Sequence, residues 1–107
     1  MKIKIITICG SMKYQNEMIK IAKNLETKFG YCVLQCVYDF MSENLKKQEY
    51  EKIVKAHFKK IDLSNAIYVV NIGGYVGENT QREIDYAIKH GKEIFYHEPL
   101  KEDKWWL

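Results

Sequence analysis

The sequence has no Cys-x-x-Cys pair, only one proline, and no apolar run long enough to cross a bilayer. Its three cysteines, Cys9, Cys32 and Cys36, are an odd number, and no secretory signal with a small-residue cleavage site is present. These absences argue against a disulfide-stapled secreted protein and a thioredoxin-like enzyme, and they predict a cytoplasmic protein without a membrane partner. Cys32 and Cys36 lie too far apart on a predicted strand to bridge, so we expect all three cysteines to be small core residues.

A strong charge of one sign is also missing, because the sequence has 17 basic and 14 acidic residues and a net charge of +3. Arg82 is the one arginine, and the longest lysine cluster, residues 45–60, alternates with acidic and apolar positions as a solvated helix face does. We therefore expect no nucleic-acid polymer as a partner. The histidines are scattered and no ligand spacing suits a metal, so no metal and no cofactor are predicted.

Hydrophobic residues make up 47% of the 107 residues, enough for one packed domain over residues 1–107. Apolar β-branched runs predict strands at 2–9, 31–38, 66–72 and 93–97, and apolar residues at helical spacing predict helices at 15–29, from about 49, and at 80–90. The residues expected to face inward from these helices are Met18, Ile21, Ala22, Leu25 and Phe29; Tyr50, Ile53, Val54, His57, Phe58 and Ile61; and Ile84, Ala87 and Ile88.

Alternating strands and helices predict an α/β fold made of right-handed βαβ units. We expect a small doubly wound, Rossmann-like or flavodoxin-like parallel sheet of four or five strands, in the order 2-1-3-4, with helices on both faces. In such sheets ligands bind beyond the carboxyl ends of the strands, where the strand order changes direction. That position falls between the first and third strands, so the loops "CGSMKYQ" and "NIGGYVGENT" are predicted to border one crevice.

The first of these loops combines a glycine, a hydroxyl and a cation at Gly10, Ser11 and Lys13, with Met12 between them. Such a turn ahead of a helix suits phosphate or sugar hydroxyls, although a simple tight β–α turn explains the same residues.

The second loop holds Gly73, Gly74 and Gly77, which permit unusual backbone conformations, and Tyr75, which offers a stacking surface. Asn79 or Thr80 is expected to cap the third helix. The pattern Thr80-x-x-Glu83 by itself favours a capping box, in which the glutamate turns back to its own backbone. The alternative is that Glu83 points into the crevice.

The segments "CGSMKY", "YVVNIGGYVGENT" and "REIDYA" resemble the nucleoside 2-deoxyribosyltransferase superfamily, which includes the 2'-deoxynucleoside 5'-phosphate N-hydrolases. The likeness runs from Lys2 to Glu98 and is greatest to a group of short bacterial and phage proteins. It implies that Glu83 is the nucleophile that forms a covalent glycosyl-enzyme. It also implies a substrate-binding set formed by Gly10, Ser11, Met12, Lys13, Asn71, Gly73, Gly74, Tyr75, Gly77, Asn79 and Thr80.

The resemblance implies cleavage or transfer of the N-glycosidic bond of 2'-deoxynucleosides or their 5'-monophosphates, by a homodimer or larger homo-oligomer. Members of the family carry an aspartate that helps the base to leave, and here His57 occupies that position, with Asp62 as a second candidate. Asn65 also replaces a common aspartate. These departures keep open a non-catalytic nucleotide-binding or sensor module. Trp105 and Trp106 are expected to cover a sheet edge or a partner subunit.

Overall fold

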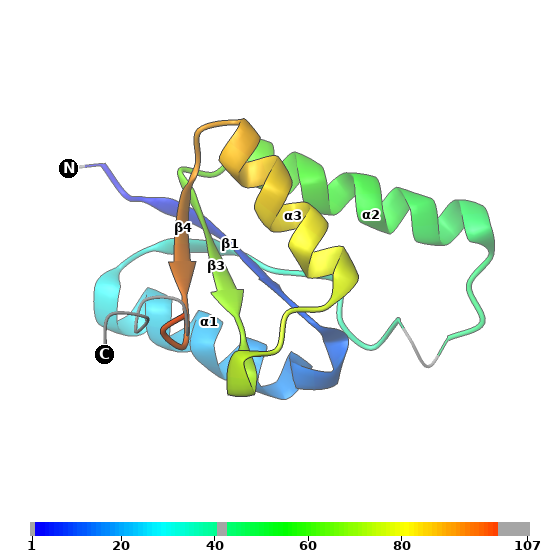
Figure 1. The fold of residues 1–107 in the computed structure, drawn as a ribbon, viewed down its shortest axis with the longest axis horizontal. Helices are drawn as coiled ribbons and strands as arrows, with labels where there is room; N and C mark the ends of the chain where they lie inside the picture. Colours follow the sequence, from blue (N-terminus) through cyan, green and yellow to red (C-terminus); the bar gives the residue numbers. More distant parts are fainter. Residues whose placement is uncertain (1, 41–42, 101–107) are drawn as a thin grey trace.

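The computed structural model describes residues 2–40 and 43–100. Along these residues strands and helices alternate as the sequence predicts (Figure 1). The elements are β1 (Ile5–Gly10), η1 (Met12–Tyr14), α1 (Gln15–Phe29), β2 (Cys32–Leu34), α2 (Lys47–Asp62), β3 (Ala66–Val70), η3 (Ile72–Gly74), α3 (Glu78–Lys89) and β4 (Glu93–Tyr96).

The described strands form a parallel sheet in the order β2-β1-β3-β4, which confirms the predicted fold class and strand order. In the central pair, Ile6 of β1 is opposite Ala66 of β3, and Gly10 is opposite Val70. Helix α1 covers one face of the sheet, while α2 and α3 cover the other (Figure 1). The strand order changes direction between β1 and β3, so their carboxyl ends form the expected crevice.

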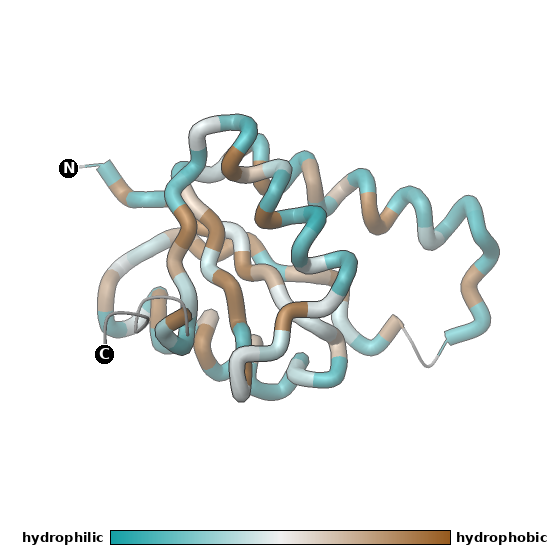
Figure 2. Tube along the Cα trace, viewed as in Figure 1, coloured by the Kyte–Doolittle hydropathy of each residue, from teal (hydrophilic) through white to brown (hydrophobic). Residues whose placement is uncertain are grey.

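Side chains of the central strands alternate between two apolar layers, as the period of a strand requires. On the α1 face, Ile8 and Val70 pack with Met18 and Leu25. On the other face the layer contains Cys9, Ile67 and Val69 from the strands and Ile61, Ile84 and Ala87 from the helices. The apolar residues concentrate on the strands and the inner faces of the helices (Figure 2). Cys9 therefore belongs to the layer beneath α2 and α3.

Several details of the sequence prediction are wrong. Phe29 and Ile88 were expected to face inward, but 62% and 60% of their surfaces are exposed. Phe29 lies at the last position of α1 and stacks on Tyr31 at the surface, and Ile88 lies one residue beyond the buried Ala87 of α3. The second strand ends at Leu34, and Cys32 is exposed at this sheet edge.

Helix α2 extends beyond the sheet at its amino-terminal end (Figure 1). The sheet therefore covers only part of the predicted inward stripe: His57 and Ile61 are buried, whereas Tyr50 is exposed. Trp105 and Trp106 lie outside the described residues. Among the described residues, no helix is both long and apolar enough to span a membrane.

Candidate functional site

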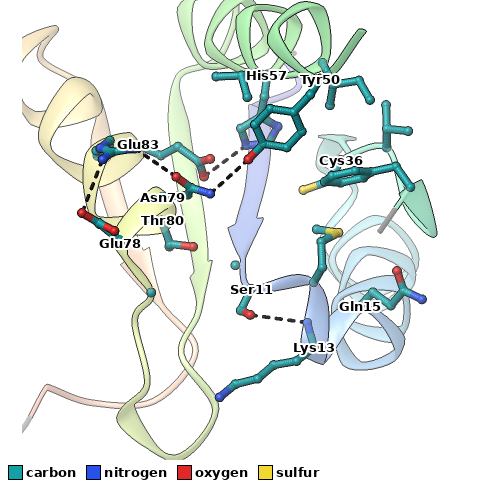
Figure 3. Close-up of a pocket in the computed structure, with 18 of the residues that line it drawn as sticks. Ser11, Lys13, Gln15, Cys36, Tyr50, His57, Glu78, Asn79, Thr80 and Glu83 are labelled. Atoms are coloured by element: carbon teal, nitrogen blue, oxygen red, sulfur yellow. Dashed lines mark hydrogen bonds and ion pairs between the residues drawn. The ribbon is translucent and has the colours of Figure 1, made fainter. Parts of the chain in front are cut away.

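A cavity of about 860 Å³ lies at the carboxyl ends of β1 and β3, where the sequence predicted a crevice (Figure 3). Four segments contribute to its walls: residues 10–15 after β1, residues 36–40 after β2, the inner face of α2 from 50 to 60, and residues 75–83 after β3. The predicted residues that line it are Gly10, Ser11, Met12, Lys13, His57, Tyr75, Gly77, Asn79, Thr80 and Glu83.

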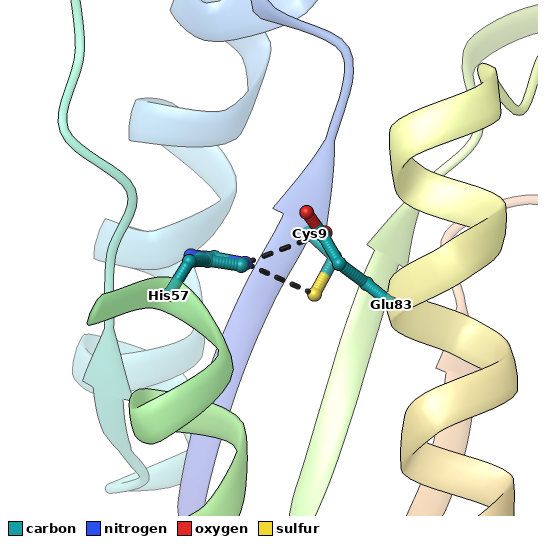
Figure 4. A group of neighbouring side chains, drawn as sticks. All are labelled: Cys9, His57 and Glu83. Carbon is teal, nitrogen blue, oxygen red and sulfur yellow. Dashed lines mark hydrogen bonds and ion pairs between the residues drawn. The ribbon is translucent and has the colours of Figure 1, made fainter. Parts of the chain in front are cut away.

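Three chemically active side chains meet at one end of this cavity (Figure 4). The alternation of β1 points Cys9 toward the helices, and α2 and α3 place His57 and Glu83 above it. The His57 Nε2 atom lies 3.4 Å from Glu83 Oε1 and 3.5 Å from Cys9 Sγ. Residues 9, 57 and 83 are thus joined by the parallel topology alone, since no local motif links them.

The surroundings of this cluster hold a charged pair at neutral pH. Burial by itself lowers the pKa of His57, but its hydrogen bonds with Cys36, Cys9 and Glu83 outweigh burial and raise that pKa above the usual value. Burial raises the pKa of the Cys9 thiol to about 12, so Cys9 stays protonated. The carboxylate of Glu83 is the partner of the His57 imidazolium in this ion pair. Side-chain exposures of 10% for His57 and 17% for Glu83 leave this pair in contact with the cavity.

The raised pKa of His57 predicts that stability falls as pH rises above neutrality. The folded state keeps the His57 proton that the unfolded chain releases above pH about 6.5. The contribution of this proton to the free energy of unfolding is therefore full below that pH, and it is lost as the pH rises toward the pKa of His57 in the folded state. The slope is at most about 1.4 kcal/mol per pH unit for one such group. We expect urea unfolding at pH 6.5, 7.5 and 8.5 to show this decline, and to show a smaller one in His57→Gln. Equal slopes in both proteins would contradict the charged pair.

The capping box predicted from Thr80 and Glu83 is wrong. Helix α3 begins at Glu78, its N-cap is Gly77, and within residues 2–40 and 43–100 no side chain caps it. Glu83 therefore lies in the second turn, where its carboxylate reaches His57 rather than its own backbone (Figure 3). The positive end of the helix dipole acts mainly within the first turn, so His57 is the nearer source of positive charge for Glu83.

The uncapped first turn of α3 opens onto the cavity. Glycine at position 77 lets the backbone lie close to the Tyr75 side chain, because a Cβ at this position would lie 3.2 Å from the Tyr75 hydroxyl oxygen. Thr80 is only 4% exposed and lines the cavity, where Figure 3 shows its hydroxyl pointing inward. Free backbone N–H groups and a hydroxyl at one place suit an anionic or hydroxyl-bearing ligand.

The loop after β1 reaches across to the glycine-rich loop. The Lys13 ammonium lies 3.6 Å from the centre of the Tyr75 ring, a cation–π contact that joins the two loops. Ser11 Oγ accepts a hydrogen bond from the Lys13 backbone N–H at 3.4 Å. A Cβ on Gly10 would lie 3.1 Å from Met18 Sδ and 3.3 Å from Val70, so glycine allows this loop to pack close to the sheet.

Asn71, Gly73 and Gly74 were predicted to bind substrate, but they do not line the cavity. Asn71 is 1% exposed, donates to the Glu98 carbonyl at 2.9 Å and accepts from the Glu98 N–H at 2.8 Å. The Gly73 N–H donates to the Glu98 carboxylate at 2.9 Å. Gly73 and Gly74 both have a positive φ, which explains the glycine pair by turn geometry. These residues connect the end of β3 to the segment after β4.

We therefore expect Asn71→Ala to destabilise the protein by about 1–3 kcal/mol, because the partly buried N–H and carbonyl of Glu98 lose their partners. Michaelis constants for any substrate should change little. Thermal and urea unfolding measure the effect, and Asn24→Ala, an exposed asparagine on α1, is the matched control. An unchanged stability together with a large loss of substrate affinity would instead return Asn71 to the binding site.

Asp62 and Asn65 also lie away from the cavity. The Asp62 carboxylate accepts a hydrogen bond from the Tyr86 hydroxyl, and its backbone carbonyl accepts one from Lys92 Nζ at 3.0 Å. The Asn65 side chain accepts from the Ile5 N–H at 2.8 Å and thereby fixes the start of β3 beside β1. Of the two candidate proton donors, the structure brings only His57 to Glu83.

Sequence reasoning missed several residues of the cavity, notably Cys9 as a partner of His57 and Tyr50 as part of the wall. Tyr50 accepts a hydrogen bond from Asn79 Nδ2 at 3.3 Å, and Asn79 in turn accepts one from Arg82 at 3.1 Å. The period of β1 was the available signal for Cys9, because it puts residues 7 and 9 on the face opposite Ile8.

The cavity thus combines a carboxylate, a protonated imidazole, hydroxyls and an open helix start. This set can perform nucleophilic substitution on a polar substrate, with a proton donor at hand. Models of known protein families were compared with the chain and none matches, and no match is found among curated proteins.

Proposed function

We propose that this protein cleaves or transfers the N-glycosidic bond of a 2'-deoxynucleoside or its 5'-monophosphate, with Glu83 as the nucleophile. The observation that carries the proposal is the Glu83 carboxylate, which faces a cavity of about 860 Å³ and is paired with His57 at 3.4 Å. The resemblance of the surrounding loops to nucleoside 2-deoxyribosyltransferases supports the same chemistry. A cavity of this size accommodates a nucleotide.

In the first step, the Glu83 carboxylate attacks the anomeric carbon of the deoxyribose and the bond from that carbon to the base nitrogen breaks. The product is a glycosyl ester on Glu83. In the second step, water or a second base attacks the same carbon and releases Glu83 as a carboxylate. Retention of configuration at the anomeric carbon follows from the two displacements.

His57 is suited to protonate the departing base. While Glu83 is a carboxylate, the imidazolium is stabilised by its ion pair. Ester formation removes that negative charge, so the pKa of His57 falls as the base leaves and the proton becomes easier to donate. The same group can then accept a proton from the attacking water when the ester is hydrolysed.

The other residues of the cavity wall are polar on one side and aromatic on the other. Ser11, Lys13, Thr80 and the open start of α3 offer donors for sugar hydroxyls or a phosphate. On the other side, Phe40 and Tyr50, with ring centres 5.9 Å apart, offer apolar and aromatic surface for a base. We further propose a homo-oligomer, because the exposed Tyr50 lies on the part of α2 that extends beyond the sheet, where a second subunit can cover it.

The test is incubation of the purified protein with each 2'-deoxynucleoside, with and without its 5'-phosphate, followed by chromatography of the free base. We expect base release from at least one of them, and less from the matching ribonucleosides. Thermal stabilisation by a nucleotide that is recovered intact would instead support a binding or sensor module. Neither release nor stabilisation with any of these compounds would reject both functions.

A further inference from the structure

We propose that Cys9, His57 and Glu83 form a binding site for one zinc ion, and that zinc at this site blocks the nucleophile. The three residues offer a thiolate sulfur, an imidazole nitrogen and a carboxylate oxygen, which are the ligand types that zinc prefers. Among the described residues, this cluster places all three candidate ligand atoms within 4.8 Å of one another (Figure 4).

Two of the three distances between these atoms match those between ligands of a tetrahedral zinc ion, and the third is at most 4.8 Å. Bond lengths of about 2.3 Å to sulfur and about 2.0–2.1 Å to nitrogen or oxygen give edges of about 3.5 Å for S···N and about 3.3 Å for N···O. The observed separations are 3.5 Å for Cys9 Sγ to His57 Nε2 and 3.4 Å for His57 Nε2 to Glu83 Oε1. The third separation, from Cys9 Sγ to the Glu83 oxygen, is at most 4.8 Å. In a triangle with these sides the centre lies at most about 2.4 Å from each of the three atoms, which is close to a zinc–ligand bond length.

The site also has the access that a metal ion needs. Cys9 is fully buried beneath the cluster, whereas His57 and Glu83 line the cavity, so the metal would enter from the cavity. Three protein ligands leave a fourth position directed at that open space, where a water molecule or a ligand can bind. The ligands come from β1, α2 and α3, which the packed core already holds together, so little folding entropy opposes binding.

Binding is balanced by the release of two protons. The Cys9 thiol and the His57 imidazolium each lose one proton, and the zinc ion accepts one lone pair from each of the three ligands. The complex of Zn²⁺ with one thiolate, one neutral imidazole and one carboxylate carries no net charge. Neutrality favours its formation in a partly buried place.

The inference goes beyond the proposed function and has a definite consequence for it. A zinc-bound Glu83 cannot attack an anomeric carbon, and a zinc-bound His57 has no proton to give on Nε2. If the protein releases base from deoxynucleosides, stoichiometric zinc should therefore inhibit that release, and a chelator should restore it.

The test measures zinc binding without any substrate, so its outcome is separate from that of the glycosidic reaction. Metal-free protein is titrated with Zn²⁺ against a chromophoric chelator, and with Co²⁺ while the thiolate-to-cobalt absorption band is followed. We expect one ion per chain and a thiolate band in the wild type. Cys9→Ala and Glu83→Gln should each weaken binding by at least about 100-fold, since loss of a direct ligand exceeds the 10–100-fold cost of losing a supporting contact.

Cys32→Ala is the matched control, because Cys32 is a free thiol exposed at the edge of the sheet and is not among the three ligands. It should bind zinc as the wild type does, and circular dichroism of each variant checks the fold. Glu83→Gln preserves side-chain volume and keeps the test valid if Cys9→Ala fails to fold. Absence of saturable binding, equal binding by all variants, or an equal loss in Cys32→Ala would overturn the proposal.

Discussion

Replacement of Glu83 by glutamine is expected to lower base release by about 10³-fold or more, because an amide is nearly the same size but cannot act as the nucleophile. In the proposed mechanism the carboxylate forms the glycosyl ester, so the loss should appear in kcat rather than in KM. Steady-state rates of free-base formation measure this for the best substrate found. Mass spectrometry adds a direct readout, since a trapped glycosyl adduct should be present in the wild type and absent in the variant.

Glu78 provides a matched control for this experiment. It lies on the same helix and lines the same cavity, but its side chain is 86% exposed and pairs with Arg82 at the surface. Glu78→Gln should retain at least about a third of the wild-type rate, because exposed ion pairs contribute little energy. Full activity of Glu83→Gln, or equal losses in both variants, would remove Glu83 from the role of nucleophile.

The architecture could be predicted from the sequence because its signals are strong and local. The runs at residues 2–9 and 66–72 are almost continuously apolar, as strands covered on both faces are, and they contain most of β1 and all of β3. Residues 2–4 lie before β1, where Ile3 is exposed. Gly30 ends α1 with a positive φ of 70°, as the glycine after the helical pattern indicated. The position of the crevice then followed from the parallel topology, since it needs only the order of the strands.

The details at the edges of the sheet could not be predicted in this way. The run at 31–38 looks like a full strand, but β2 pairs with β1 on one side only, and pairing stops at Leu34. The start of α3 was expected at Asn79 or Thr80, but its N-cap is Gly77, and glycine is also an acceptable N-cap residue. The contact of Tyr75 with Gly77 depends on three-dimensional packing, and it accompanies the earlier start. That earlier start moves Glu83 out of the capping position and toward α2.

The place of Cys9 beside His57 and Glu83 was hidden for a different reason. Cys9 and His57 are 48 residues apart in the chain, and no spacing rule connects either of them to residue 83. Their contact results from the placement of α2 over β1, which the chain reaches only after a crossover from β2. A sequence scan for metal-ligand or acid–base motifs depends on short spacing, so it finds none of this cluster.

Substitution of His57 by glutamine is expected to lower base release by about 10²–10⁴-fold, the usual range for loss of a general acid. Glutamine still offers a hydrogen bond toward Glu83 but has no proton to transfer at neutral pH. The loss should therefore depend on the leaving group. With 7-methyl-2'-deoxyguanosine, whose base already carries a positive charge, departure needs no protonation, and the variant should recover most of the wild-type rate.

This dependence separates proton donation from a merely structural role. If His57 only holds Glu83 in place, both substrates should lose activity equally in His57→Gln, because misplacement of the nucleophile affects every leaving group. His90→Gln is the control: His90 is exposed at the end of α3 and stacks on Tyr86, away from the cavity, so both rates should stay near those of the wild type. Equal losses for the two substrates would assign His57 to positioning and leave the proton to be supplied by water in the cavity.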